Sequence, residues 1–181
     1  MNRNVVVGAV AAALALVAGV YIGGGGLQEA PAVAGAVAPE AISRFFAARL
    51  NDTQGRPQAI AQWQGQVLVV NFWATWCPPC REEMPALARL QTKYAAKNVR
   101  FVGISLDTAD NVVKYETQNP VGYPLLIASE EGPELTRQLG NSRLALPYTV
   151  VLGRGGDVQM TTLGRVSEAE LDALLLKLSP P

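Results

Sequence analysis

Two cysteines lie three positions apart in this sequence, and they are the side chains best suited to reversible covalent chemistry. Cys77 and Cys80 are the only cysteines among the 181 residues, and two prolines separate them in the stretch "WCPPC". A thiolate can attack a disulfide and form a mixed disulfide, which a second thiol then resolves. Positions three apart share one face of a helix, so Cys80 is placed to attack Cys77. The pair therefore predicts a nucleophile, Cys77, with a resolving thiol, Cys80.

The position of Cys77 favours its thiolate form. The apolar run from Val67 to Trp73 has the composition of a strand buried on both faces, and a helix is expected to start just after Cys77. The positive end of the helix dipole and the free N–H groups of the first turn lower the pKa of a thiol placed there. Pro78 suits the first helical position because its missing N–H costs nothing. We therefore expect a reactive cysteine at the helix start.

Other uses of the cysteine pair fit the sequence less well. Structural zinc requires four ligands, and this chain has two cysteines and no histidine, so a zinc site would require a dimer. A purely structural disulfide would close a very short loop and remove little entropy from the unfolded chain. The lack of histidine also excludes Ser-His and Cys-His catalytic pairs. No metal and no other cofactor is predicted.

Charge is balanced over the chain as a whole. Fifteen basic residues match fifteen acidic ones, and no run rich in lysine or arginine occurs. Nucleic-acid-binding domains normally carry a basic patch or stripe. Nucleic acid is therefore excluded as a predicted partner.

The elements that position the cysteines form a strand–helix–strand unit. After Cys80, apolar residues recur at helical spacing and give a stripe that can pack on a sheet: Met84, Leu87, Leu90 and Tyr94. The apolar stretch from Val99 to Asp107 has the pattern of a second buried strand. A strand, a helix and a strand in this order predict two parallel strands joined by a right-handed crossover.

Further strands and helices are expected around this unit. Before the unit, the sequence predicts a turn around Gly55 and Pro57. After it come a helix capped by Asp107 or Thr108 that runs to about Gln118, a short edge strand from Pro124 to Ile127 and a helix from Pro133 to Leu139. Two strands around a turn at Arg154 to Asp157 and a helix that Ser167 and Glu170 cap complete the order. The prediction is an α/β fold with a mixed central sheet flanked by helices on both faces.

The N-terminus has the composition of a membrane-directed segment. Arg3 precedes an uncharged run from Val5 to Ile22, which is long enough to cross a bilayer as a helix. We therefore expect an anchor or signal segment at residues 1–23, a flexible linker at 24–41 and one folded domain at 42–181. The positive-inside rule puts that domain outside the cytoplasm, which in a bacterium is the periplasm. Cleavage, which would leave a soluble periplasmic protein, is the alternative.

The cysteine motif and its surroundings resemble a known family. The stretch "FWATWCPPC", Pro85 five residues after the second cysteine, and Pro147 directly before "YTVVL" are similar to thiol-disulfide oxidoreductases with a thioredoxin-like fold. Over about residues 42–178, "VNFWATWCPPCREEMPAL" most closely resembles the membrane-tethered TlpA/ResA type. The resemblance implies that Cys77 is the exposed attacking thiol and Cys80 the buried one. It also implies a cis-proline at Pro147 beside the disulfide, with the backbone of Leu146 free to pair with a substrate strand.

The resemblance also implies partners and a direction of electron flow. Members of this type reduce disulfides of exported proteins, such as apocytochrome c or copper-site cysteines, with electrons from a transmembrane donor of the CcdA or DsbD type. The periplasm is kept oxidising, so a reductase tethered at the bacterial inner membrane can be recharged from across it. A dithiol oxidase or isomerase is the competing direction. A thioredoxin-scaffold module that binds client proteins or metal without turnover is the alternative from another class.

At one position this chain differs from thioredoxins, which have a buried acid near the cysteines. Thioredoxins carry an aspartate in the strand before the cysteines, whereas this chain has Asn71 there. Asp107 ends the second parallel strand at the edge where chemistry gathers in such sheets, and its position resembles that of an active-site acid in ResA-like proteins. We therefore predict Asp107 as a catalytic acid, with helix capping as its alternative role.

The remaining residues near the motif receive simpler predictions. Trp76 and Pro78, which flank Cys77, are predicted to contact the substrate, whereas Trp73 is expected to pack in the core. Glu82 and Glu83 are expected, with the preceding arginine, to form a solvated face.

Overall fold

The computed structural model of the chain describes residues 37–179. The predicted anchor at 1–23 and most of the predicted linker lie outside these residues. Helix α2 (Pro39–Ala47) includes Pro39, Glu40 and Ala41, which were assigned to the end of the linker. Between residues 37 and 179, no helix is long and apolar enough to cross a membrane.

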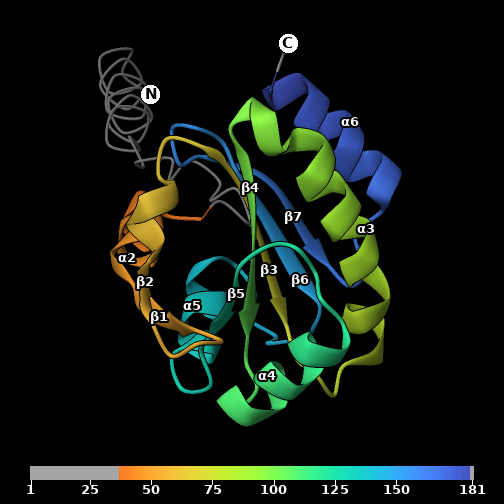
Figure 1. Cartoon of the computed structure of the whole chain (residues 1–181). Coiled ribbons are helices and arrows are strands. Elements are labelled where there is room, and N and C mark those ends of the chain that lie inside the picture. Colours follow the sequence, from red (N-terminus) through yellow and green to blue (C-terminus); the bar gives the residue numbers. More distant parts are fainter. Residues whose placement is uncertain (1–36, 180–181) are drawn as a thin grey trace, which may run out of the picture. The chain divides into compact units, whose positions relative to one another are not determined.

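Seven strands form one mixed sheet in the order β2-β1-β5-β4-β3-β6-β7 (Figure 1). β3 runs parallel to β4, β4 runs parallel to β5, and the other neighbours are antiparallel. The strands are β1 (Arg49–Asp52), β2 (Pro57–Ala59), β3 (Val67–Trp73), β4 (Val99–Ser105), β5 (Leu125–Ile127), β6 (Tyr148–Leu152) and β7 (Val158–Leu163). The predicted mixed sheet is confirmed.

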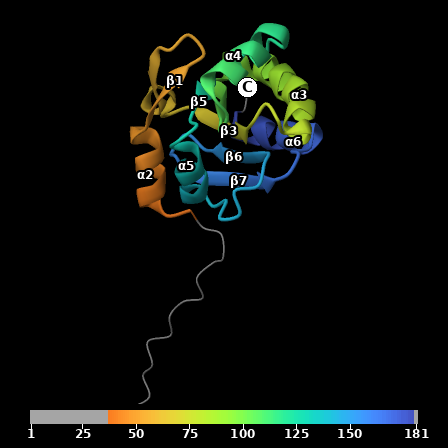
Figure 2. The same cartoon turned by 90° about the horizontal axis from the view of Figure 1, so that it is seen from below.

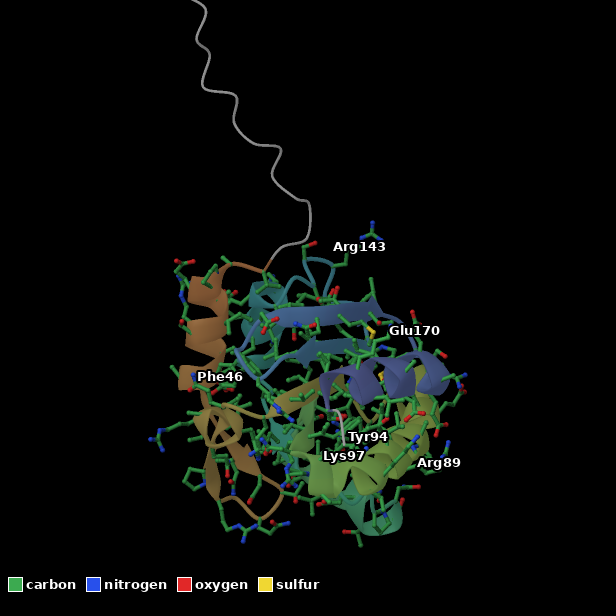
Figure 3. The ribbon with its side chains drawn as sticks, turned by 90° about the horizontal axis from the view of Figure 1, so that it is seen from above. Phe46, Arg89, Tyr94, Lys97, Arg143 and Glu170 are labelled. Carbon is green, nitrogen blue, oxygen red and sulfur yellow. A yellow bond between two sulfur atoms is a disulfide. The ribbon has the colours of Figure 1, made fainter. Side chains whose placement is uncertain are left out.

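Helices cover both faces of the sheet (Figures 1 and 2). Besides α2 they are α3 (Pro78–Tyr94), α4 (Ala109–Gln118), α5 (Gly132–Gln138) and α6 (Glu168–Leu178), with short 3-10 turns η1 (Ile60–Trp63) and η2 (Ala95–Lys97). Side chains of α3, α4 and α6 pack with one face, and those of α2, α5 and η1 pack with the other. Phe46 and Tyr94, labelled in Figure 3, belong to these two different cores.

The two central strands are buried because helices cover both of their faces. All seven residues of β3 are buried, as the uninterrupted apolar run predicted, and β4 is nearly so. The predicted stripe on α3 is also confirmed, since Met84, Leu87, Leu90 and Tyr94 are all buried. The cysteine motif is thus carried by the most deeply packed strand and helix of the domain.

The second half of the chain also follows the predicted order. The helices α4 and α5 and the hairpin of β6 and β7 lie where they were expected. The Ser167 side chain accepts a hydrogen bond from the backbone N–H of Glu170 and caps α6. The leucine stripe on α6 points inward, with Leu171 and Leu175 fully buried.

The turn predicted around Gly55 is present, whereas Pro57 begins β2, and the pairing of β1, β2 and β5 differs from the prediction. The stretch around Gly55 is a hairpin of two short strands, β1 and β2, in which Asp52 accepts hydrogen bonds from the backbone N–H groups of Gln54 and Arg56. The prediction of an edge strand at β5 is wrong, because β1 pairs with its outer side. A four-residue strand far earlier in the chain supplies that neighbour, and local periodicity does not reveal such a pairing.

Candidate active site

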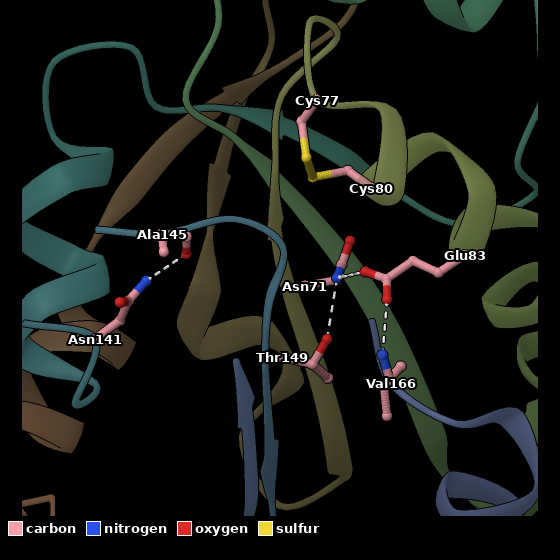
Figure 4. Close-up of a disulfide and its surroundings, with 8 residues drawn as sticks. All are labelled: Asn71, Cys77, Cys80, Glu83, Asn141, Ala145, Thr149 and Val166. Atoms are coloured by element: carbon pink, nitrogen blue, oxygen red, sulfur yellow. Dashed lines mark hydrogen bonds between the residues drawn. A yellow bond between two sulfur atoms is a disulfide. The ribbon is translucent and has the colours of Figure 1, made fainter. Parts of the chain in front are cut away.

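A disulfide joins Cys77 and Cys80 at the start of α3 (Figure 4). Cys77 is the N-cap residue, and Pro78 is the first residue of the helix, as predicted. Because Pro78 and Pro79 have no N–H, the first amide of this helix that can face the sulfurs belongs to Cys80. The helix dipole still has its positive end at Cys77.

The two sulfurs differ little in exposure in this disulfide form. Cys80 is fully buried, as the resemblance implied. The implied exposure of Cys77 is wrong for the disulfide form, because only 4% of the residue is exposed. Its side chain is bonded inward to Cys80 and belongs to the apolar core under α3. Trp76, the preceding residue, is 67% exposed and is the most prominent apolar side chain next to the disulfide.

The segment before β6 lies at the same end of the sheet. The peptide bond between Leu146 and Pro147 is cis, as the resemblance implied. Tyr148 pairs with Phe72 in the antiparallel ladder, so Pro147 lies level with Trp73 at the end of β3 that leads to Cys77. Leu146 is half-buried, and Pro147 is buried. The Pro147 carbonyl accepts a hydrogen bond from the backbone N–H of Gly164 at 2.8 Å.

A buried carboxylate lies one helical turn after Cys80. Glu83 is only 2% exposed, so the prediction that it belongs to a solvated face is wrong, whereas Glu82 is exposed as expected. The Asn71 amide donates to Glu83 Oε1 at 2.7 Å, and the backbone N–H of Val166 donates to Oε2 at 2.9 Å (Figure 4). The same Asn71 amide donates to the Thr149 hydroxyl at 3.0 Å. Glu83 therefore connects α3, β3 and the segment that leads into α6.

The sequence contained a signal for this burial. Counted along α3 from Cys80, the buried stripe recurs at alternating steps of three and four, at Glu83, Leu87, Leu90 and Tyr94. Glu83 therefore occupies a core-facing position of the helix. What the spacing does not provide is the identity of the partners, because Asn71 and Val166 come from distant parts of the chain.

Burial and hydrogen bonding act in opposite directions on Glu83. Loss of water disfavours the charged form and raises the pKa of Glu83 above its ordinary value of 4.5. Hydrogen bonds from Val166 and Asn71 and the charge of Arg165 offset part of this rise. A carboxylate with a raised pKa holds a proton more readily than a solvated one, which is a property that general acid–base groups share.

Asp107 is also buried, with 6% exposure, but its partners differ. Thr75 donates its hydroxyl proton to Asp107 Oδ2, and Oδ1 accepts from the backbone N–H of Thr108 and the Asn111 amide at 2.7 and 2.8 Å. Burial by itself would raise the pKa of Asp107, but the hydrogen bonds from Asn111, Thr75 and Thr108 outweigh it and lower the pKa. Asp107 therefore stays charged and ties the loop before Cys77 to the start of α4.

The two tryptophans near the motif are separated as the sequence predicted. Trp73 is fully buried in β3, and its ring lies 5.1 Å from the Tyr115 ring, centroid to centroid. Its indole N–H has no hydrogen-bond partner within residues 37–179. Trp76 projects to the surface, where Pro78 is also exposed. No group of three or more potential metal ligands occurs in the part of the chain that the structure describes.

The assembled site has the parts needed for reversible thiol chemistry. Two sulfurs are joined in a disulfide at a helix start, and a buried carboxylate lies on the same helix one turn later. An exposed tryptophan and a cis-proline segment stand at the end of the sheet from which the cysteine loop departs. Such an arrangement can store two electrons as a dithiol and release them as a disulfide.

Comparison with known proteins points to the same chemistry. A family model described as Redoxin matches residues 28–175. The thiol-disulfide oxidoreductase ResA of Bacillus thuringiensis subsp. konkukian is 29% identical over 132 residues, which cover 72% of this chain and 74% of that protein. A thiol:disulfide interchange protein of the thioredoxin family from Chlorobium tepidum TLS has a solved structure that matches with a TM-score of 0.62 and 31% identity, over 72% of this chain and 92% of that one. StoA from Bacillus subtilis shares the fold, with a TM-score of 0.58 and 22% identity over 71% of this chain and 95% of its own.

Proposed function

This chain belongs to the Redoxin family and is a thiol-disulfide oxidoreductase of the TlpA/ResA type with a thioredoxin-like fold, and from this premise we propose that it reduces disulfides in exported proteins. The observation that carries the catalytic part of the proposal is the buried Glu83, which lies one helical turn after the buried Cys80 and is hydrogen-bonded to Asn71. A disulfide that only stabilised the fold would not require a proton acceptor with a raised pKa beside it.

The reaction begins with the reduced protein. The Cys77 thiolate attacks one sulfur of the substrate disulfide, the substrate S–S bond breaks, and the other substrate sulfur leaves as a thiolate that takes a proton from water. The Cys80 thiol then gives its proton to Glu83 and attacks Cys77. The second substrate thiolate leaves, and the Cys77–Cys80 disulfide forms. Two electrons pass from the protein dithiol to the substrate, and a dithiol donor must restore the protein afterwards.

The polar groups around Glu83 can accommodate its protonated form. Asn71 Oδ1 has no hydrogen-bond partner within residues 37–179, and the Thr149 hydroxyl can either donate or accept. When the Asn71 side chain turns its oxygen toward Glu83, that oxygen can accept one hydrogen bond from the protonated Glu83 carboxyl and another from the Thr149 hydroxyl. An aspartate at position 71 would repel the charged Glu83, which gives a physical reason for an asparagine there.

The other site residues serve as substrate contacts and supports. We assign the exposed Trp76 and Pro78, with the Leu146–Pro147 segment, to the substrate-docking surface. Asp107, predicted as a catalytic acid, is assigned here as a support for the Thr75 loop, because its lowered pKa keeps it charged.

The direction and the cellular setting rest on the N-terminal composition and on the resemblance. The apolar run at residues 5–22 supports an anchor at 1–23 followed by a linker and the folded domain on the periplasmic side of the bacterial inner membrane. Tethering suits a reductase that receives electrons from a transmembrane donor of the CcdA or DsbD type, and apocytochrome c or copper-site cysteines are the proposed substrates. In an oxidase, electrons would pass from the substrate to the same two cysteines, and in an isomerase they would pass in both directions.

Insulin reduction in the presence of dithiothreitol tests the catalytic part of the proposal. The native protein is expected to accelerate precipitation of the insulin B chain, and Cys77→Ser is expected to leave only the rate due to dithiothreitol. Cys80→Ser should accumulate a mixed disulfide that mass spectrometry detects, because the resolving thiol is missing. A Cys77→Ser protein as active as the native one would refute the proposal.

A redox titration against glutathione and dithiothreitol buffers tests the direction. A reductase is expected to have a potential near or below roughly −230 mV, within the range of thioredoxin-like reductants. A potential as oxidising as ~−120 mV would instead support the oxidase.

A further inference from the structure

The loop between α5 and the cis-proline is fixed by one buried side chain. Asn141 is only 3% exposed, and its amide donates to the carbonyl of Ala145 at 2.9 Å (Figure 4). Its backbone N–H donates to the Thr136 carbonyl inside α5 at 3.0 Å, and its own carbonyl accepts from the backbone N–H of Leu144 at 3.2 Å. Asn141 thus connects a rigid helix to both of the residues that precede Leu146.

The loop that Asn141 closes has a specific shape. Gly140, with φ 103°, turns the chain out of α5, and Leu144 has φ 52°, in the left-handed region that a leucine rarely adopts. Arg143, labelled in Figure 3, points away from the sheet and is exposed. A leucine held at positive φ costs free energy, so contacts elsewhere must hold the loop in this conformation. The hydrogen bonds of Asn141 to Leu144 and Ala145 are placed to do so.

The end of this loop presents unpaired backbone groups. The N–H and C=O of Leu146 form no hydrogen bond with other residues in the range 37–179, whereas the carbonyl of Ala145 is already occupied by Asn141. An extended client chain can therefore pair with Leu146 in the manner of an added strand. Because Asn141 fixes the residue just before Leu146, it also fixes the direction of those free groups.

A purely structural role explains Asn141 less well. Its Oδ1 is buried without a hydrogen-bond partner among the described residues, which destabilises the fold. Fold stability alone would therefore favour an apolar residue at this position. The amide donor is the part of the side chain that is used, and it bonds the loop that leads to the cis-proline.

We propose that Asn141 is a positioning residue that holds residues 142–146 in the conformation on which a client polypeptide docks. The inference rests on the proposed function, because it assumes that polypeptide disulfides are the substrates. Asn141 does not touch the reacting sulfurs, so its loss should weaken client binding and leave the thiol chemistry intact. The site thereby favours extended polypeptide segments over small disulfides that make no backbone contact.

Steady-state kinetics of Asn141→Ala with two substrates test the inference. For insulin, KM is expected to rise about tenfold with kcat nearly unchanged, since one lost hydrogen bond and a loosened loop are worth about that factor. For 5,5′-dithiobis(2-nitrobenzoate), which has no backbone to pair, the rate of attack by the reduced protein should stay within about twofold. The redox potential of the cysteine pair should also be unchanged.

Asn119→Ala is the matched control. The Asn119 amide also donates to a backbone carbonyl, that of Tyr115, but it lies at the exposed end of α4. Asn119→Ala is expected to match the native protein on both substrates. Asn141→Ser, which is polar but too short to reach Ala145, should reproduce the effect of Asn141→Ala.

The outcomes separate this inference from the proposed function. If both Asn141 variants show native KM for insulin, or lose activity on both substrates alike, the positioning role is refuted while the native activity stands. Failure of both variants to fold would show that Asn141 only maintains the structure and would also refute it. If the native protein itself does not reduce insulin, the proposed function fails first.

Discussion

Glu83 and Asp107 are both buried near the disulfide, yet the structure gives them opposite charge preferences. Glu83 lies in the core under α3 and accepts from one amide and one backbone N–H. Asp107 lies at the end of β4 and accepts from a hydroxyl, an amide and a backbone N–H. Burial prevails at Glu83 and raises its pKa, whereas hydrogen bonds prevail at Asp107 and lower its pKa.

The comparison indicates that the hydrogen-bond donors around a buried carboxylate decide the direction in which its pKa shifts. A buried carboxylate that accepts several hydrogen bonds keeps its negative charge and is suited to support a loop. A group with fewer donors, whose pKa is raised by burial, takes up a proton more readily and is suited to exchange it. We therefore expect the loss of Glu83 to affect the reaction and the loss of Asp107 to affect stability.

The largest expected effect comes from Glu83→Gln. Removal of the proton acceptor should slow the resolving step by about 100-fold at pH 7, because general-base catalysis contributes at least that much. Glutamine fits the same space, and Asn71 can turn its amide to pair with it. Rapid-quench measurement of the mixed disulfide formed with a model substrate checks the rate.

Glu82→Gln provides the control for Glu83→Gln. Glu82 is exposed and forms a surface ion pair with Arg165, so this substitution should change the rate less than about twofold. Equal rates for the two variants would remove the distinction between the acids.

A smaller effect is expected from Asp107→Asn, and it should appear in stability. The substitution weakens charge-assisted hydrogen bonds from Thr75, Asn111 and Thr108, so the free energy of unfolding should fall by about 1–3 kcal/mol. The rate of thiol exchange should change only a few-fold. Urea unfolding of the oxidised protein checks this, with Asp110→Asn as the control, for which a loss below about 1 kcal/mol is expected because the exposed Asp110 lies in the first turn of α4. A large loss of exchange rate with unchanged stability would contradict the supporting role and favour the prediction that Asp107 is a catalytic acid.

The smallest expected effect concerns how the two acids' contributions to the free energy of unfolding change with pH. Because the folded state raises the pKa of Glu83, its contribution to stability falls as pH rises from about 4.5 through the raised value. Because the folded state lowers the pKa of Asp107, its contribution is present above 3.8 and is lost as pH falls through the lowered value. Unfolding free energies of the native protein minus those of Glu83→Gln and Asp107→Asn, measured from pH 3 to 8, should therefore slope in opposite directions. Parallel slopes would mean that the two environments do not differ as described.

Much of the fold follows from periodicities that are local in the sequence. The apolar run of β3, the stripe on α3, the turn between β6 and β7 and the cap at Ser167 were all predictable, since each depends on neighbours a few positions away. The hairpin of β1 and β2 was not, because its strands are short and gain their stability by pairing with β5. The interior position of β5 followed from that same distant pairing.

Some features of the candidate site also depend on local sequence, and others depend on distant contacts. The spacing of Cys77 and Cys80, the proline at the helix start and the position of Pro147 before β6 are properties of the sequence by itself, because one turn of helix and one strand fix them. The charge preference of Glu83 belongs to the tertiary structure. It arises where α3, β3, β6 and the segment before α6 meet, and the pKa of a carboxylate depends on how much water and how many donors remain around it once the chain has folded.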